Sequence, residues 1–105
     1  MGLVLIACYK PIEGKEEELC SLIKTHAELI KSEGLATNRE SILMKSKDNS
    51  VIEVFEWKSK EAFESAKTNP NVQKLWYMFS QISDFIPLSN LDETSEVFAD
   101  FIAIK

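Results

Sequence analysis

The chain is poor in several residue types that usually carry chemistry. It has one histidine, two cysteines and three glycines among its 105 residues. The cysteines, Cys8 and Cys20, lack a CxxC spacing, and no two glycines lie close together. These features argue against a zinc site, which needs several Cys, His or carboxylate ligands, and against a glycine-rich phosphate loop. We expect two free thiols in a reducing cytoplasm, no metal and no bound cofactor.

Basic residues and long apolar runs are also scarce. The 12 Lys and Arg residues are outnumbered by 17 Asp and Glu residues, and the formal net charge is −5. A nucleic-acid partner needs a basic patch to displace counterions, and none is visible. No apolar run reaches the roughly 18–20 residues of a membrane span. The start of the chain lacks the basic region and cleavage site of a secretion signal. We therefore expect a cytoplasmic protein that binds neither nucleic acid nor membrane.

The apolar content, 45% of the chain, is that of one globular domain, which we assign to residues 1–105. Residues 3–9 are a nearly continuous apolar run, typical of a strand buried on both faces. From residue 12 to residue 33 the apolar positions have helical spacing, and Gly34 suits the left-handed position after a helix. This part of the chain predicts a strand followed by a helix.

A β-hairpin is predicted next. Residues 36–46 alternate loosely, and residues 51–57 are rich in β-branched and aromatic side chains. Residues 47–50 form the predicted loop. A four-residue loop sets the facing pairs as Met44 with Glu53, Ile42 with Phe55, and Glu40 with Trp57. A slip of one residue would exchange the faces of the strands.

The remaining chain predicts a helix in two parts and a final strand. Ser59 caps the first part, and Asn69 caps the second, which has Pro70 at its first position and runs to Ile82. Residues 97–104 form the last predicted strand. The order β-α-β-β-α-β predicts an α+β domain of the ferredoxin-like type, with a four-stranded antiparallel sheet.

Both faces of the predicted sheet are apolar. In the first strand Val4 and Ile6 alternate with Leu5 and Ala7, so neither face is polar. Helices cover only one face of such a sheet. The loop of residues 87–96 is too short to cover the other face, and we expect a homodimer that buries it.

The segments Trp57–Phe63 and Asn69–Val72, together with Trp76 and the helix end at Ser32–Gly34, resemble the antibiotic biosynthesis monooxygenase family. The resemblance covers nearly the whole chain. It implies a dimeric α/β barrel with a pocket between the sheet and the helices of each subunit. It also implies a cofactor-independent monooxygenase that oxidises a small aromatic substrate, a quinol or polyketide, with O2. Such chemistry needs a dry pocket and a group that stabilises the substrate anion.

Two departures from that family stand in the second helix. Many members carry a histidine there, where this chain has Ala66-Lys67. The haem-degrading branch needs a strand asparagine, a helix tryptophan and a histidine iron ligand. Ala66 and Trp76 occupy the last two of those positions here. A haem oxygenase is therefore not expected.

Three residues are candidates for catalysis. His26 lies on the apolar stripe of the first helix between Ile23 and Ile30. Its ring is either a hydrogen-bonded core group or a proton acceptor that lines the pocket. Glu53 has no evident partner, and it is either a solvent-facing edge residue or a carboxylate of raised pKa. Asn38 shares a face with Trp57 in the predicted register, where it either supplies an amide to the ligand or simply begins a strand.

Four aromatic residues are candidates for the wall of the substrate pocket: Tyr9, Trp57, Trp76 and Phe79. Large aromatic side chains are as often core or interface packing as ligand contacts. Glu56 lies on the face opposite Glu53, and we expect it to pair with Arg39 on the neighbouring strand.

Three functions remain open at the level of the sequence. The first is the cofactor-independent monooxygenase. The second is a small-molecule-binding or stress-associated protein that uses the same pocket without turnover. The third is an isomerase or decarboxylase with His26 or Glu53 as its base.

Overall fold

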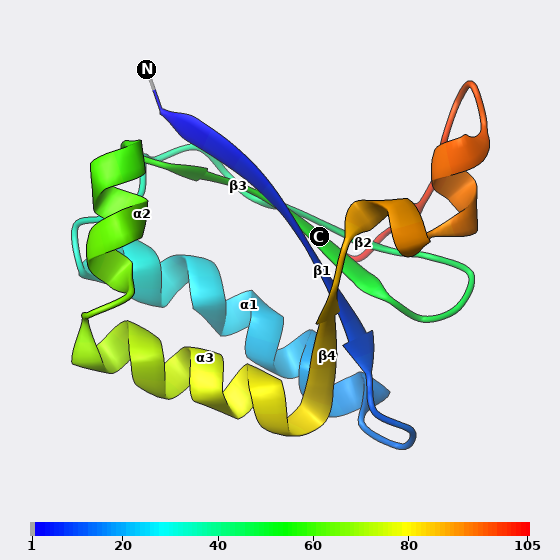
Figure 1. Ribbon diagram of the computed structural model, residues 1–105, viewed down its shortest axis with the longest axis horizontal. Helices are drawn as coiled ribbons and strands as arrows, with labels where there is room; N and C mark the ends of the chain where they lie inside the picture. Colours follow the sequence, from blue (N-terminus) through cyan, green and yellow to red (C-terminus); the bar gives the residue numbers. More distant parts are fainter. Residues whose placement is uncertain (1) are drawn as a thin grey trace.

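The chain has an α+β fold with a five-stranded antiparallel sheet and three α-helices, as the computed structural model, which describes residues 2–105, shows (Figure 1). The strands are β1 (Leu3–Pro11), β2 (Ile42–Lys45), β3 (Val51–Trp57), β4 (Ser83–Ile86) and β5 (Ile102–Ala103). The helices are α1 (Glu16–Ser32), α2 (Lys60–Ala66) and α3 (Pro70–Ile82). Two short 3-10 turns, η1 (Leu88–Asn90) and η2 (Asp92–Ser95), separate β4 from β5. The strand order is β4-β1-β3-β2-β5, so β3 is the central strand.

Three helix boundaries follow local sequence signals, as predicted, whereas α1 begins at Glu16 rather than at residue 12. The Ser59 side chain accepts a hydrogen bond from the Ala62 N–H (3.0 Å) and caps α2. Asn69 caps α3 in the same way, and Pro70 is its first residue. Gly34 follows α1 with φ +75°, a left-handed conformation that glycine adopts without strain.

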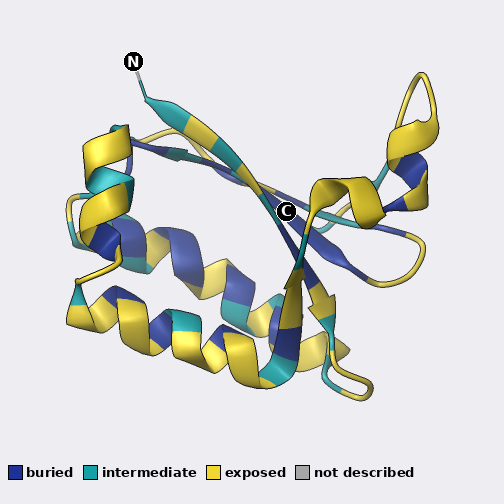
Figure 2. Cartoon of the chain, viewed as in Figure 1, coloured by how far each residue is buried: buried dark blue, intermediate teal, exposed yellow. Residues whose placement is uncertain are grey.

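All three helices cover one face of the sheet (Figure 1), and their inward sides are buried while their outward sides are exposed (Figure 2). On this face Leu5 from β1 packs with Phe55 and Trp57 from β3, and Ala7 and Tyr9 from β1 belong to a second core cluster. The alternation predicted for β1 and β3 is confirmed. The apolar core therefore lies between the sheet and the helices.

The opposite face is covered in part by the chain itself. Leu91 of the segment after β4 packs on Cys8 and Ile52, with Met44 and Phe101 beside them. The expectation that this segment is too short to cover the sheet is wrong for that region, because the two 3-10 turns fold it back over β1 and β3. Beyond it an apolar row crosses the face, and Ile6 and Ile42 in that row are each about half exposed (51%).

The C-terminal part of the chain differs from the prediction. The strand that follows α3 is β4, which begins at the residue after the helix and pairs with Cys8–Pro11 of β1. Within residues 97–104 only Ile102–Ala103 form a strand, β5, at the far edge beside β2. The sheet therefore has five strands rather than four. Four residues with a single apolar pair, Phe85-Ile86, are too short for a periodic signal.

The predicted hairpin register is wrong by one residue. Ile42 faces Val54, Leu43 faces Glu53 and Met44 faces Ile52. The loop has three residues rather than four, since the Ser46 N–H donates to the Ser50 carbonyl (2.9 Å) and Asn49 has φ +70°. A left-handed residue at the end of a three-residue loop is a common hairpin geometry.

Candidate functional site

A buried carboxylate in the central strand organises the candidate site. Glu53 points from β3 toward the helices and is 2% exposed. It lies directly across from Ala7 on β1 and from Leu43 on β2. One carboxylate oxygen, Oε2, lies 2.9 Å from Nδ1 of His26 on α1. The other, Oε1, accepts a hydrogen bond from the Tyr9 hydroxyl at 3.4 Å. Glu53 is therefore not an edge residue but a buried acceptor with two partners.

The second ring nitrogen of His26 has its own partner. The Trp76 indole N–H on α3 donates to His26 Nε2 at 3.2 Å. An indole N–H is only a donor, so Nε2 carries the lone pair of the ring. The single ring proton is then on Nδ1, which donates it to Glu53. In this arrangement the His26 ring brings no positive charge and donates through Nδ1–H to the Glu53 carboxylate.

Burial and the neighbouring Glu53 carboxylate both raise the pKa of the Tyr9 hydroxyl. Burial is the larger cause that raises the pKa of Tyr9 well above its ordinary value, and the charge and hydrogen bond of Glu53 raise it further. Burial also raises the pKa of the Cys8 thiol. Both groups are thus neutral at pH 7, and Tyr9 acts as a hydrogen-bond donor rather than as a base.

A cavity of about 330 Å³ adjoins this network, and its lining comes from both faces of β1: Leu5, Ala7 and Tyr9 on the helix-covered face, and Ile6 and Cys8 on the other. It is lined by five of the candidate residues chosen from the sequence: Tyr9, His26, Glu53, Trp57 and Trp76. Sequence reasoning missed further wall residues, which come from β1, β3, α2, β4 and the segment after β4: Leu5, Ala7, Phe55, Phe63, Phe85, Ile86 and Leu88. These are ordinary apolar residues, and only their proximity to the network marks them.

The aromatic walls pack edge to face around the cavity. The centroid of the Trp57 ring lies 5.3 Å from the centroid of the Phe63 ring and 6.4 Å from that of the Trp76 ring, and both pairs are edge to face. Phe79 is fully buried, stacks on Tyr9 (4.9 Å) and contacts the His26 ring edge-on (5.7 Å). It therefore supports the network from behind and does not line the cavity.

Two other predicted positions lie outside the cavity. Asn38 is exposed in the irregular segment before β2, so it does not share a face with Trp57. The prediction that it contacts a ligand in the pocket is therefore wrong. The cause is that the predicted strand of residues 36–46 is only Ile42–Lys45, because the chain leaves the sheet after a single bridge between Ala36 and Trp57. Arg39 pairs with Glu56 (Nε to Oε1, 3.0 Å), as expected. Hydrogen bonds from Thr37 and Arg39 lower the pKa of Glu56.

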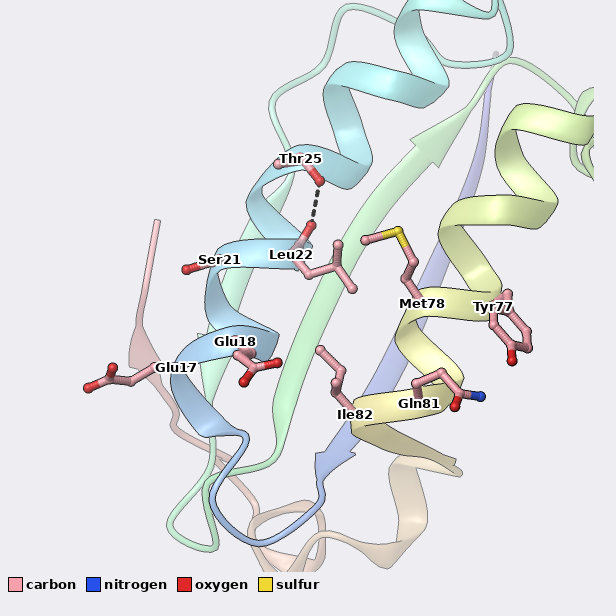
Figure 3. A pocket seen from close by; sticks show the side chains of 9 residues that line it. All are labelled: Glu17, Glu18, Ser21, Leu22, Thr25, Tyr77, Met78, Gln81 and Ile82. Atoms are coloured by element: carbon pink, nitrogen blue, oxygen red, sulfur yellow. Dashed lines mark hydrogen bonds between the residues drawn. The ribbon is translucent and has the colours of Figure 1, made fainter.

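A second hollow, of about 680 Å³, lies on the outer side of the helix layer between α1 and α3 (Figure 3). Leu22, Met78 and Ile82 project into it, and the exposed carboxylates of Glu17 and Glu18 lie at one end. It holds no member of the His26–Glu53 network. We therefore place the candidate site in the inner cavity.

The geometry allows acid–base chemistry on a small molecule. Nε2 of His26 is the one basic atom directed away from Glu53, and Glu53 would stabilise the imidazolium if Nε2 took up a proton. Within residues 2–105, no three His, Cys, Asp or Glu side chains come together as metal ligands. Among the helices of that part of the chain, none has the length and apolar character needed to cross a membrane.

A comparison of the chain with known protein families, with curated proteins and with solved structures finds no match. The resemblance to the antibiotic biosynthesis monooxygenase family therefore stays a prediction.

Proposed function

We propose that the protein binds a small aromatic molecule in the inner cavity and that His26 removes a proton from it, so that the resulting anion reacts with O2. The observation that supports this proposal most strongly is the His26–Glu53 pair. His26 Nδ1–H donates to Glu53 Oε2 (Nδ1 to Oε2, 2.9 Å). Nε2 is then the basic atom of the ring at the cavity. A general base held in one tautomer by a carboxylate is a recurrent device for proton abstraction.

The rest of the cavity suits such a reaction. Its apolar and aromatic walls would keep water from an electron-rich anion. For a substrate with an acidic CH2 group, the balance is CH2 + O2 → C=O + H2O. The substrate supplies four electrons, one oxygen atom enters the product, and the other leaves as water. His26 would take the first proton once the substrate displaces the Trp76 indole N–H from Nε2.

Oxygen uptake tests the proposal directly. The purified metal-free protein should consume O2 with some member of a panel of hydroquinones and anthrones that includes members with an amino group. The His26→Gln variant should lower that rate by about 100-fold or more, the usual contribution of a general base. Thr25→Ala, an exposed neighbour on the same helix, is the matched control and should keep the rate. The proposal fails if no member of the panel raises uptake above the buffer rate.

A second function is favoured by a different contact. The Trp76 indole N–H occupies the lone pair of His26 Nε2, so every polar atom of the network already has a partner. A non-enzymatic protein that only binds small molecules needs nothing more. That function predicts a higher melting temperature with aromatic ligands that are recovered unchanged after incubation.

We also propose that the fold is ferredoxin-like and that two copies pack through their sheets as a dimeric α/β barrel. Two features support this: the β-α-β-β-α-β order that ends at β4, and the apolar row of Ile6, Val54 and Ile42 across three strands of the open face. Val4, about half exposed, extends that row along β1. A two-fold axis would pair each row with its own copy.

A further inference from the structure

The inner cavity combines aromatic walls with a single formal charge. Six aromatic side chains line it, in addition to His26: Tyr9, Phe55, Trp57, Phe63, Trp76 and Phe85. No lysine or arginine of the described residues is among its lining residues, and Glu53 is the only carboxylate. The electrostatic character of the cavity therefore depends on whether its own network neutralises that carboxylate.

The directions of the hydrogen bonds indicate that no group of the network brings a positive charge to Glu53. Trp76 donates to His26 Nε2, so the histidine ring has one proton and no charge. His26 Nδ1–H and the Tyr9 hydroxyl then solvate the Glu53 carboxylate as neutral donors. The network thus holds one carboxylate, 2% exposed, whose two hydrogen-bond partners bring no positive charge. A buried charge without an opposite charge is costly, and a cation in the cavity would offset that cost.

The walls favour the same kind of ligand. Aromatic faces carry a negative quadrupole that attracts ammonium groups, above all when the cation is shielded from water. Phe63 already holds one cation in this way, because the Lys67 ammonium lies 5.3 Å from its ring centroid. Lys67 itself is not a lining residue and is paired with Glu64 at 3.1 Å. It therefore leaves the charge of Glu53 uncompensated.

We infer that the cavity selects small organic cations, namely protonated amines that carry an aromatic or apolar group, over neutral or anionic molecules of the same shape. The inference rests on the proposed function, since it takes the inner cavity to be the ligand site, and it narrows the class of ligand. The ammonium group would lie between the aromatic rings and the Glu53 carboxylate. The apolar part would fill the remainder of the 330 Å³.

Three probes of nearly equal size test the inference: benzylamine, which is protonated at pH 7, benzyl alcohol and benzoate. Both tryptophans of the chain line the cavity, so intrinsic fluorescence reports on occupancy. Benzylamine should bind about ten-fold more tightly than benzyl alcohol, which is the range of a desolvated cation–π contact, and benzoate more weakly than either. Glu53→Gln should abolish the preference for benzylamine. Glu28→Gln, the same change at an exposed residue of α1 outside the cavity, is the matched control and should retain the preference.

The outcomes separate the two proposals. If benzyl alcohol binds as tightly as benzylamine, or if Glu53→Gln keeps the preference, the inference of cation selectivity is wrong while ligand binding in the cavity stands. If none of the three probes binds, the cavity is not a ligand site and both proposals fail. Should Glu53→Gln not fold, the order of affinities in the unaltered protein still decides the inference.

Discussion

Glu53 is the residue on which the buried network depends, because it accepts hydrogen bonds from both His26 and Tyr9. Glu53→Ala would leave two buried donors without an acceptor, and we expect a loss of about 2–4 kcal/mol in the free energy of unfolding. Tyr9→Phe leaves only Oε1 of Glu53 without its donor, and because that hydrogen bond is long (3.4 Å) we expect a smaller loss of about 1 kcal/mol. Urea denaturation measures both. Equal losses in the two variants would contradict the network.

The Tyr9 hydroxyl gives the protein a predicted alkaline limit. Its pKa in the folded state is raised by burial and by Glu53, whereas in the unfolded chain it is about 10. Its contribution to stability is therefore complete below pH 10 and is lost as the pH rises toward the folded-state pKa. Thermal unfolding measured between pH 8 and pH 12 should show this loss. Tyr9→Phe should flatten that part of the profile, and an unchanged profile would contradict the assignment.

At this scale the sequence predicts one partner of the network better than the other. The 3.6-residue period of α1 places His26 on the inner stripe, and that position is confirmed. The partners of Glu53 depend on how β1 lies against β3, which pairs residues more than forty positions apart. No local pattern encodes that alignment, because it is set by the packing of the whole sheet.

Among the elements, the end of α1 gives a clear test of local backbone conformation. Gly34 has φ +75°, and an added Cβ would meet no other atom within 4 Å. Any cost of Gly34→Ala therefore comes from the left-handed backbone, and we expect about 1 kcal/mol. Asn tolerates this conformation, so Gly34→Asn should lose less. Chemical denaturation of both variants checks the order, and equal stability of Ala and glycine at this position would contradict it.

The sequence predicts the elements with strong periods and fails on the short ones. Helix α1 and strand β3 follow from their patterns, and the caps at Ser59 and Asn69 follow from their chemistry. Strand β4 is missed because it begins directly where α3 ends and has only four residues. Its place is decided by pairing with β1 over Cys8–Pro11, which is a tertiary contact.

For the whole molecule, the exposed apolar row on the open face of the sheet predicts self-association. Light scattering coupled to size exclusion should give twice the chain mass of 11.9 kDa. Ile6→Asp introduces a charge into the row and should yield monomers, since burying an unpaired charge is costly. Met78→Asp on the outer helix layer is the matched control and should stay dimeric. A monomeric unaltered protein would contradict the proposed dimer.

The protonation state of His26 is the point on which the site and its proposed chemistry both rest. Since the chain has a single histidine, a long-range ¹H–¹⁵N NMR spectrum of the imidazole ring contains one set of signals. At pH 7 Nδ1 should be protonated and Nε2 unprotonated, as the hydrogen bonds to Glu53 and Trp76 require. A doubly protonated ring, or a ring with its proton on Nε2, would contradict this assignment.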